Sequence, residues 1–231
     1  LQLVREVSWA NIRDKVALGL LNGAQMLAGM PIATALGINQ APMRMLAPFC
    51  LNRNGNAISV SQGLFAALSE EGDTDTSVAN TGEMLRRVIA RRQASGAPPL
   101  TFGMVYPFSC HNYELRYWMA ASGIDPDSDV RLVVIPPPLM VDSLRQGHVD
   151  GFCVGEPWNS LAVEAGIGRI IASKAELWRH GVEKVLCVPE SWAVANAEIL
   201  AALIRALDRA AIWSEQPENR PRLASLLASS A

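Results

Sequence analysis

Short apolar runs and helical segments alternate regularly in the middle of the chain. The runs "LTFGMV", "VRLVVIP" and "DGFCVG" are strand-like, and each is followed by a segment with helical spacing. Parallel strands that are covered by helices on both faces of their sheet have this pattern. The middle of the chain therefore predicts an α/β fold with a largely parallel sheet.

The first part of the chain carries a less regular version of the same pattern. We predict a strand over residues 1–7, a helix over 10–23 and, over 24–37, a short buried strand followed by a helix that opens at Pro31. Two further strands are predicted within 43–62, separated by an Asn-Gly pair that is typical of a tight turn.

A Gly- and Pro-containing linker, "QASGAPP", divides the chain near residues 94–99. Before it, an apolar helical face predicts a helix over 75–92. We predict three parts: a first lobe over 1–97, a second lobe over 98–189, and C-terminal helices over 190–231 that return to the first lobe.

The composition argues against several functional classes. Hydrophobic residues make up 50% of the 231 residues and charged residues 18%, which is enough apolar material for a substantial core. A net charge of −2 with scattered Lys and Arg provides no basic surface for nucleic acid, and no apolar run reaches the ~18 residues of a membrane span. GxSxG, P-loop and HExxH motifs do not occur, so we do not expect an enzyme.

The four cysteines, Cys50, Cys110, Cys153 and Cys187, show neither CxxC spacing nor histidines at ligand spacing, so no metal site and no cofactor are predicted. Three of them lie in apolar runs, which favours buried, reduced thiols and a cytoplasmic location. The N-terminus shows no initiator Met, n-region or lipobox, and it predicts a fragment or a processed form. A periplasmic or membrane-anchored location is the alternative if an upstream signal exists.

A histidine stands where a helix is predicted to begin, in "PFSCHNYELRYW". Unpaired N–H groups and the dipole at a helix start favour an anion, and protonated His111 would be unfavourable there unless an anion compensated it. The competing interpretation is a neutral His111 that caps the helix. We expect His148 and His180 at the surface or in structural roles.

Loops at the ends of predicted strands offer the other candidate positions. The stretch "VGEPWN", which contains Glu156 and Trp158, follows a strand, and ligands gather at the carboxyl ends of strands in open α/β sheets. The alternative is a Pro turn with Trp158 in the core. Trp9 lies at the turn from the first predicted strand to the first helix. Two lobes with such loops predict a cleft between them.

Three segments, 111–159, "SWANIRDKVALG" (8–19) and "NGNAISVS" (54–61), resemble the nitrate and bicarbonate binding-protein family, the NrtA/CmpA group. Within this family, the chain is most similar to the cytoplasmic NasS-type nitrate/nitrite sensors, and the resemblance covers nearly the whole chain. It implies a type II periplasmic-binding-protein fold, in which two α/β lobes close on a ligand. It also implies a first lobe that lacks the family's first strand and helix.

The family pattern implies four ligand-binding residues, namely Trp9, Asn56, His111 and Lys184. Asn56 stands where the transport proteins tend to carry Gln, and Gln62 is a less favoured substitute by spacing. The alternative for Lys184 is a surface position that its flexible stem can reach.

Nitrate carries one negative charge and three acceptor oxygens, so its binding requires several donors and a cation. Lys184, His111, the Asn56 amide N–H₂ and the Trp9 indole could supply them. A bicarbonate site should instead offer an acceptor for the ligand hydroxyl and often a metal. Nitrate or nitrite is therefore the predicted ligand.

Three functions compete on this basis. The first is a nitrate or nitrite sensor that sequesters an RNA-binding antitermination partner of the NasT type and releases it when ligand closes the cleft. The second is the substrate-binding component of a nitrate ABC transporter, whose partner would be the permease. The third is an enzyme of related fold, which would need a catalytic His or Cys cluster that the sequence does not show. We expect the sensor.

Overall fold

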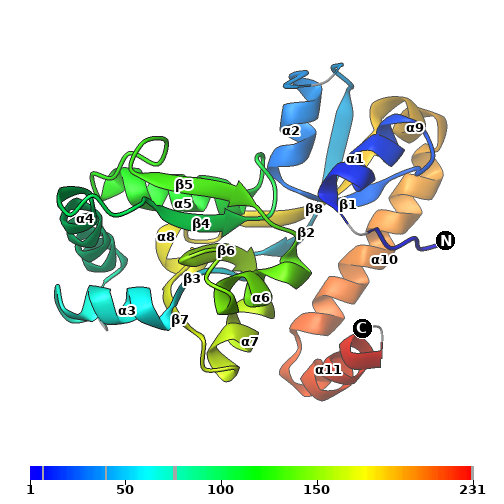
Figure 1. Ribbon diagram of the computed structural model, residues 1–231. Coiled ribbons are helices and arrows are strands. Elements are labelled where there is room, and N and C mark those ends of the chain that lie inside the picture. Colours follow the sequence, from blue (N-terminus) through cyan, green and yellow to red (C-terminus); the bar gives the residue numbers. More distant parts are fainter. Residues whose placement is uncertain (7, 40, 75–76, 230–231) are drawn as a thin grey trace.

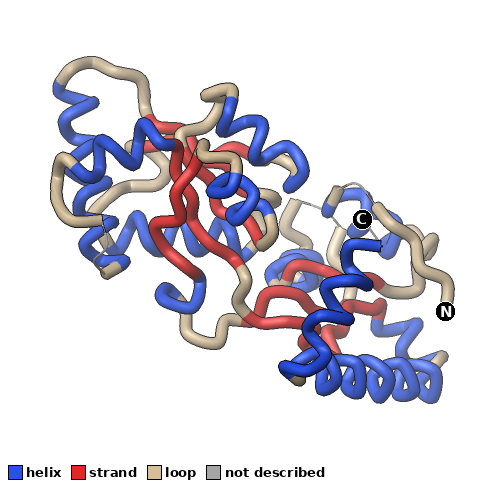
Figure 2. Tube along the Cα trace, turned by 90° about the horizontal axis from the view of Figure 1, so that it is seen from below, coloured by secondary structure: helices blue, strands red, loops and turns tan. Residues whose placement is uncertain are grey.

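The computed structural model describes residues 1–6, 8–39, 41–74 and 77–229. The chain forms two lobes, and each lobe is built around its own β-sheet (Figure 1, Figure 2). The described residues within 8–53 and 182–229 form what we call the small lobe. Those within 56–178 form the large lobe. The lobes are joined where the chain passes from one sheet to the other, near residues 53–56 and 178–182.

The large lobe contains a five-stranded sheet with the order β5-β4-β6-β3-β7. Its strands are β3 (Asn56–Ser61), β4 (Leu100–Met104), β5 (Val130–Val134), β6 (Gly151–Gly155) and β7 (Gly168–Ser173). The β–α alternation correctly predicts that β4 runs parallel to β5 and β6. However, β3 enters from the small lobe and lies antiparallel to both β6 and β7, so the sheet is mixed.

Helices surround this sheet (Figure 1). They are α3 (Gln62–Ser69), α4 (Val78–Ala94), α5 (Cys110–Ala121), α6 (Met140–Arg145), α7 (Trp158–Glu164) and α8 (Lys174–Leu177), with a 3₁₀ turn η1 (Pro137–Leu139). In α4, the Ser77 side chain caps the N-terminus by accepting from the Asn80 amide, and Met84 and Leu85 lie on the buried face that the spacing predicts. Residues 75–76 of the predicted helix lie outside the described part of the chain.

The small lobe contains a three-stranded antiparallel sheet with β8 in its centre. Its elements are α1 (Trp9–Ala17), β1 (Ala24–Leu27), α2 (Gly29–Ala35), β2 (Met45–Arg53), β8 (Val182–Pro189), α9 (Glu190–Ala195), α10 (Ala197–Glu215), η2 (Pro217–Asn219) and α11 (Arg220–Ser229). Leu200 of α10 packs with Leu186 and Val188 of β8 in one apolar cluster. The long helix α10 therefore lies against the small-lobe sheet, as Figure 1 shows.

The sheet topology differs from the predicted division of the chain at residue 97. Strand β3, α3 and α4 precede that point but belong to the large lobe, and β8 lies within 98–189 but belongs to the small lobe. The Asn-Gly pair explains the difference. Asn54 and Gly55 have positive φ angles of 56° and 84°, as a tight turn requires, but the strands on either side pair with different sheets instead of with each other.

The predicted strand at the N-terminus is wrong. Residues 1–6 contain no regular secondary structure and pair with neither sheet, and residue 7 lies outside the described residues. Regular structure begins only at α1, where the Ser8 hydroxyl caps the helix by accepting from the Asn11 amide. An alternating pattern alone cannot form a strand unless another strand offers its backbone N–H and C=O groups.

The two lobes touch directly. A guanidinium nitrogen of Arg13 in α1 donates a 2.7 Å hydrogen bond to the Tyr106 hydroxyl, which follows β4 in the large lobe. A Cβ atom at Gly29 would lie 2.4 Å from the Phe108 carbonyl oxygen, so the start of α2 approaches the loop before α5 too closely for a side chain. Among the described residues, no helix is both long and apolar enough to cross a membrane.

Candidate functional site

A cavity of about 350 Å³ opens where the two lobes meet. It is lined by Gln25, Leu51, Asn52, Asn54, Gly55, Asn56, Gly155, Glu156, Glu183 and Lys184. These residues come from the small-lobe sheet, from the turn between β2 and β3, and from the neighbouring ends of β3 and β6. The cavity therefore corresponds to the cleft that the two-lobed fold predicts.

Asn56 begins β3 and is buried beside two carboxylates. Its Nδ2 donates to both oxygens of Glu114, at 3.3 and 3.1 Å, and to Oε2 of Glu183, at 2.7 Å. Its Oδ1 is buried and has no hydrogen-bond partner among the described residues. The amide N–H₂ is consequently engaged within the protein, and Asn56 presents an acceptor where the prediction requires a donor.

His111 lies in the first turn of α5 and is only 2% exposed. Neither Nδ1 nor Nε2 makes a hydrogen bond within the described part of the chain, although Nε2 lies 3.5 Å from Oε1 of Glu183. Ser109, not His111, caps the helix, because its hydroxyl accepts from the Asn112 amide at 3.1 Å. The capping role proposed as the alternative for His111 is therefore filled by another residue.

Lys184 and Trp9 meet at the small-lobe side of the site. Nζ of Lys184 lies 2.8 Å from Oε1 of Glu183 and 5.7 Å from the centre of the Trp9 ring. The Lys184 side chain is 14% exposed, so its stem does not carry the ammonium to open solvent. Lys184 lines the cavity, Trp9 lies beside it, and their contact is a cation–π interaction.

A buried ion-pair network underlies these residues. Nζ of Lys174, which is fully excluded from solvent, lies 2.9 Å from Oε1 of Glu114 and 2.5 Å from Oε2 of Glu183. Burial raises the pKa of Glu114 despite the neighbouring ammonium. For Glu183, burial acts in the same direction, but the positive charges of a protonated His111, Lys184 and Lys174 outweigh it and lower the pKa. Glu183 therefore favours its ionised form.

This network has the donor atoms of a metal site but already contains a cation. Ligand atoms of Cys110, Glu114 and Glu183 all lie within 4.8 Å of one another. The Lys174 ammonium, however, lies within hydrogen-bonding distance of both carboxylates and supplies the positive charge that a metal ion would bring.

Sequence reasoning missed Glu114, Glu183 and Lys174. Glu114 gave a usable signal, because positions three apart on a helix share a face and His111 lies three residues before it. Glu183 and Lys184 are adjacent in β8, where alternate side chains point to opposite faces. Nothing in the sequence around Lys174 indicated that its side chain would be buried.

Of the three residues predicted with less support, one lines the cavity and two do not. Gln62 is exposed and donates to the Gly166 carbonyl at 3.1 Å, so it does not replace Asn56. Glu156 lines the cavity, but one of its oxygens accepts from the Ser160 amide. Trp158 packs against the apolar core instead of lining the cavity, as the alternative interpretation predicted.

The expectations for the remaining histidines agree with the structure, because His148 and His180 are exposed. Cys153 and Cys187 are buried, as their apolar runs predict, but Cys50 is only partly buried, whereas Cys110 at the start of α5 is buried. These cysteines are free thiols.

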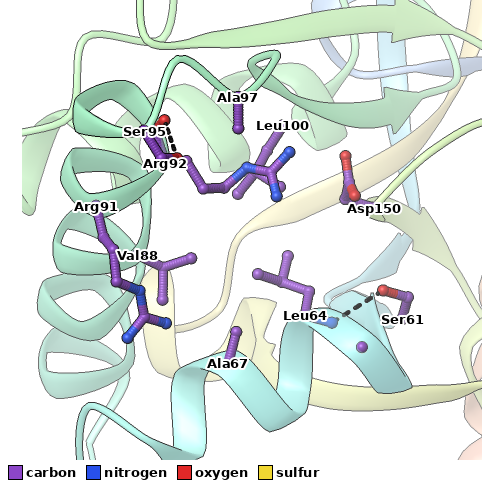
Figure 3. A pocket seen from close by; sticks show the side chains of 11 residues that line it. Ser61, Leu64, Ala67, Val88, Arg91, Arg92, Ser95, Ala97, Leu100 and Asp150 are labelled. Atoms are coloured by element: carbon purple, nitrogen blue, oxygen red, sulfur yellow. Dashed lines mark hydrogen bonds between the residues drawn. The ribbon is translucent and has the colours of Figure 1, made fainter.

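A second cavity, of about 360 Å³, lies between α3 and α4 (Figure 3). Arg92 extends over it in the direction of Asp150. Arg91 is already neutralised by Glu70 and Glu71, at 3.1 and 2.9 Å. None of the residues that the sequence singles out lines this cavity, so the candidate site is the cavity between the lobes.

Comparison with known families supports this assignment of the fold. A model of the NMT1-like family matches residues 1–228, which is almost the entire chain. The chain belongs to the NMT1-like family. Its similarity to nitrate-binding proteins, described next, agrees with the predicted resemblance to the NrtA/CmpA group.

Two kinds of relative are similar to this chain in sequence. The chain is 42% identical to the bicarbonate transport ATP-binding protein CmpC of Synechocystis over 98% of its own length, but it covers 32% of that protein. It is 36% identical to the nitrate/nitrite binding protein NrtA of Synechococcus elongatus, again over 98% of its length, and covers 51% of that protein. The chain thus spans about a third to a half of the length of these relatives.

Solved structures confirm the two-lobed α/β architecture. The periplasmic nitrate-binding protein NrtA from Synechocystis superposes with a TM-score of 0.86 at 27% identity, covering 98% of this chain and 57% of that one. The aliphatic sulphonate binding protein SsuA of Escherichia coli shares the fold with a TM-score of 0.66 at 14% identity. The predicted periplasmic-binding-protein-like fold is therefore correct, whereas the particular closeness to NasS-type sensors stays a prediction.

Proposed function

We propose that the chain is the anion-binding module of an ABC transport system and that it binds nitrate or nitrite between its lobes. One observation carries this proposal: Asn56, His111 and Lys184, which come from three separate elements and both lobes, converge on the buried carboxylate of Glu183 beside a cavity. Relatives named as nitrate-binding proteins support the choice of ligand. The module acts by binding rather than by catalysis.

Bicarbonate is the second candidate ligand, because the site contains an unused acceptor. Both hydrogens of the Asn56 amide point to carboxylates, so its orphaned Oδ1 could accept from a ligand hydroxyl. Bicarbonate carries such a hydroxyl, whereas nitrate does not. Relatives named as bicarbonate transport proteins support this alternative.

The sensor role is a narrower version of the same proposal. It requires a NasT-type partner that binds the ligand-free chain, and a cytoplasmic location. Its support is the sequence resemblance and the free cysteines. Co-purification of such a partner with the chain, reversed by added nitrate, would distinguish a sensor from a transport component.

Calorimetric titration with nitrate, nitrite, bicarbonate and sulfate tests the proposal. We expect nitrate or nitrite to bind, and we expect Lys184→Ala to weaken binding by about 10- to 100-fold, because it removes a charge-assisted hydrogen bond. Lys15→Ala is the matched control, since Lys15 is a partly exposed lysine that pairs with Glu6 away from the cavity lining. Equal binding by both variants would contradict the assigned site. Bicarbonate binding without nitrate binding would favour the second candidate.

A further inference from the structure

The buried ion-pair cluster beside the cavity is electrically balanced before a ligand binds. Glu114 and Glu183 supply two negative charges, and Lys174 and Lys184 supply two positive charges in contact with them. His111 is neutral, since burial is the largest influence on it and lowers its pKa to about 3. Both ammonium groups are therefore already neutralised, and an anion entering the site would leave one buried negative charge uncompensated.

The hydrogen-bonding groups show which side chain can respond to an anion. Asn56 has committed its amide hydrogens to the two carboxylates, whereas the Lys184 ammonium uses one of its three N–H donors on Glu183. His111 is the titratable group of the cluster whose ring nitrogens make no hydrogen bond to the described residues. A neutral imidazole offers one donor and one acceptor, whereas its protonated form offers two donors and a positive charge. Nitrate, which has only acceptors, is matched by the protonated form.

We propose that this site binds a monovalent oxyanion together with one proton, and that His111 takes up the proton. The inference rests on the proposed anion-binding function. The proton comes from the solvent, and its positive charge balances the negative charge of the anion, so the cluster is neutral both before and after binding. Because their charges are opposite, binding of the anion favours binding of the proton, and binding of the proton favours binding of the anion.

The surroundings of His111 allow this change of charge. The titratable groups of the cluster around it are Glu183 and Lys184 from β8, Lys174 from α8, Cys153 from β6, and Cys110 and Glu114 from its own helix. Glu183 favours the imidazolium, while the two lysines oppose it, with the larger effect from Lys184. The thiols stay neutral, because burial raises the pKa of Cys110 to about 12 and that of Cys153 well above its ordinary value. Glu114, whose pKa is also raised, is the competing proton acceptor.

The space beside His111 is compatible with a small ligand. A Cβ atom built on Gly155 would lie 4.0 Å from Nε2 of His111 and 3.4 Å from Oδ1 of Asn56. Because position 155 is a glycine, no side chain fills this space, and Gly155 itself lines the cavity. An oxyanion there could accept a hydrogen bond from the protonated ring.

Nitrate titration of the full chain in two buffers with different ionisation enthalpies tests the proposal. Between about pH 5 and about pH 8, we expect proton uptake that approaches one per nitrate as the pH falls, and a Kd that decreases by up to about tenfold per pH unit. His111→Gln should bind nitrate more weakly and with little pH dependence, whereas the exposed control His148→Gln should behave like the parent chain. Identical binding enthalpies in both buffers across this range would overturn the inference.

Two further measurements identify the residue that takes up the proton. The chain contains three histidines, so ¹⁵N chemical shifts of the imidazole rings should show one ring, His111, becoming cationic on addition of nitrate. Uptake that persists in His111→Gln but disappears in Glu114→Gln would assign the proton to Glu114 and overturn the role of His111. Absence of binding by nitrate, nitrite and bicarbonate would contradict the proposed function itself, whereas binding without proton uptake contradicts only the present inference.

Discussion

The Asn56 amide donates a 2.7 Å hydrogen bond to the Glu183 carboxylate, although the two residues are 127 positions apart and belong to different sheets. Both side chains are almost fully buried. The bond therefore connects the lobes inside the candidate site, and it fixes the orientation of the amide, because only its N–H₂ group can face a carboxylate. The cost of breaking such a buried bond to a charged group is about 1.5–3 kcal/mol.

Asn56→Asp should disrupt both binding and stability. The substitution is nearly isosteric, but it replaces two donor hydrogens with a third buried carboxylate beside Glu114 and Glu183. We expect the free energy of unfolding to fall by about 3–5 kcal/mol and nitrate binding to be lost. Urea denaturation and calorimetry measure these effects. Asn80→Asp, at the exposed N-terminal turn of α4, is the control and should be neutral or slightly stabilising.

Gly155→Ala should reduce nitrate affinity without unfolding the chain. The added methyl group would be in ordinary contact with Asn56 and His111, so the structure can accept it, but it would fill the space beside the histidine. We expect a Kd that is about tenfold higher, equivalent to about 1.4 kcal/mol. Gly63→Ala is the control, since a Cβ atom there meets nothing within 4 Å. An unchanged affinity in Gly155→Ala would place the anion elsewhere in the cavity.

Lys174→Met should be among the most destabilising substitutions of a charged residue in this chain. It removes the buried ammonium that lies between Glu114 and Glu183. We expect the free energy of unfolding to decrease by about 3–5 kcal/mol, because the carboxylates are left without their shared cation. Arg145→Met, which breaks the exposed pair between Arg145 and Asp142, should cost less than about 1 kcal/mol. If the two variants unfold at the same urea concentration, the buried network does not stabilise the fold.

The ligand-free chain should lose stability as the pH falls below about 6.5. The pKa of His111 is lowered to about 3 in the folded chain, whereas its ordinary value is 6.5. Its contribution to the free energy of unfolding is therefore fully present above pH 6.5, and it is lost at lower pH as the unfolded state binds a proton. Because of this one residue, the free energy of unfolding falls by up to about 1.4 kcal/mol per pH unit. Subtracting the pH dependence of stability of His111→Gln from that of the parent chain separates the effect of His111 from that of the carboxylates. If both show the same pH dependence, His111 is not the residue responsible.

Saturating nitrate should reduce this acid sensitivity. In the proposed complex His111 is already protonated, so the folded and unfolded states differ less in bound protons. Thermal unfolding at about pH 5 should therefore show a larger nitrate-induced increase in Tm than at about pH 8. An increase that is equal at both pH values would argue that anion binding involves no proton.

Much of the secondary structure follows from local patterns. The helix over α4 and the strand–helix alternation from β4 to α7 arise from periodicities of 3.6 and 2 that are visible within short windows. The Asn-Gly pair likewise specifies its own positive φ angles. The same reasoning failed for residues 1–6, because strand formation requires a partner that no local pattern can supply.

The candidate site also depends partly on local sequence and partly on tertiary contacts. Local sequence specifies which residue types are available: a histidine in the first turn of α5, a lysine in β8, a tryptophan at the start of α1 and an amide after the turn. The role of each one depends on tertiary contacts. Burial and pairing depend on residues that are distant in the chain, such as Glu114 and Glu183 around Asn56, and these contacts convert an expected donor into an acceptor. They also keep His111 neutral, because desolvation is a property of the assembled core and not of any segment.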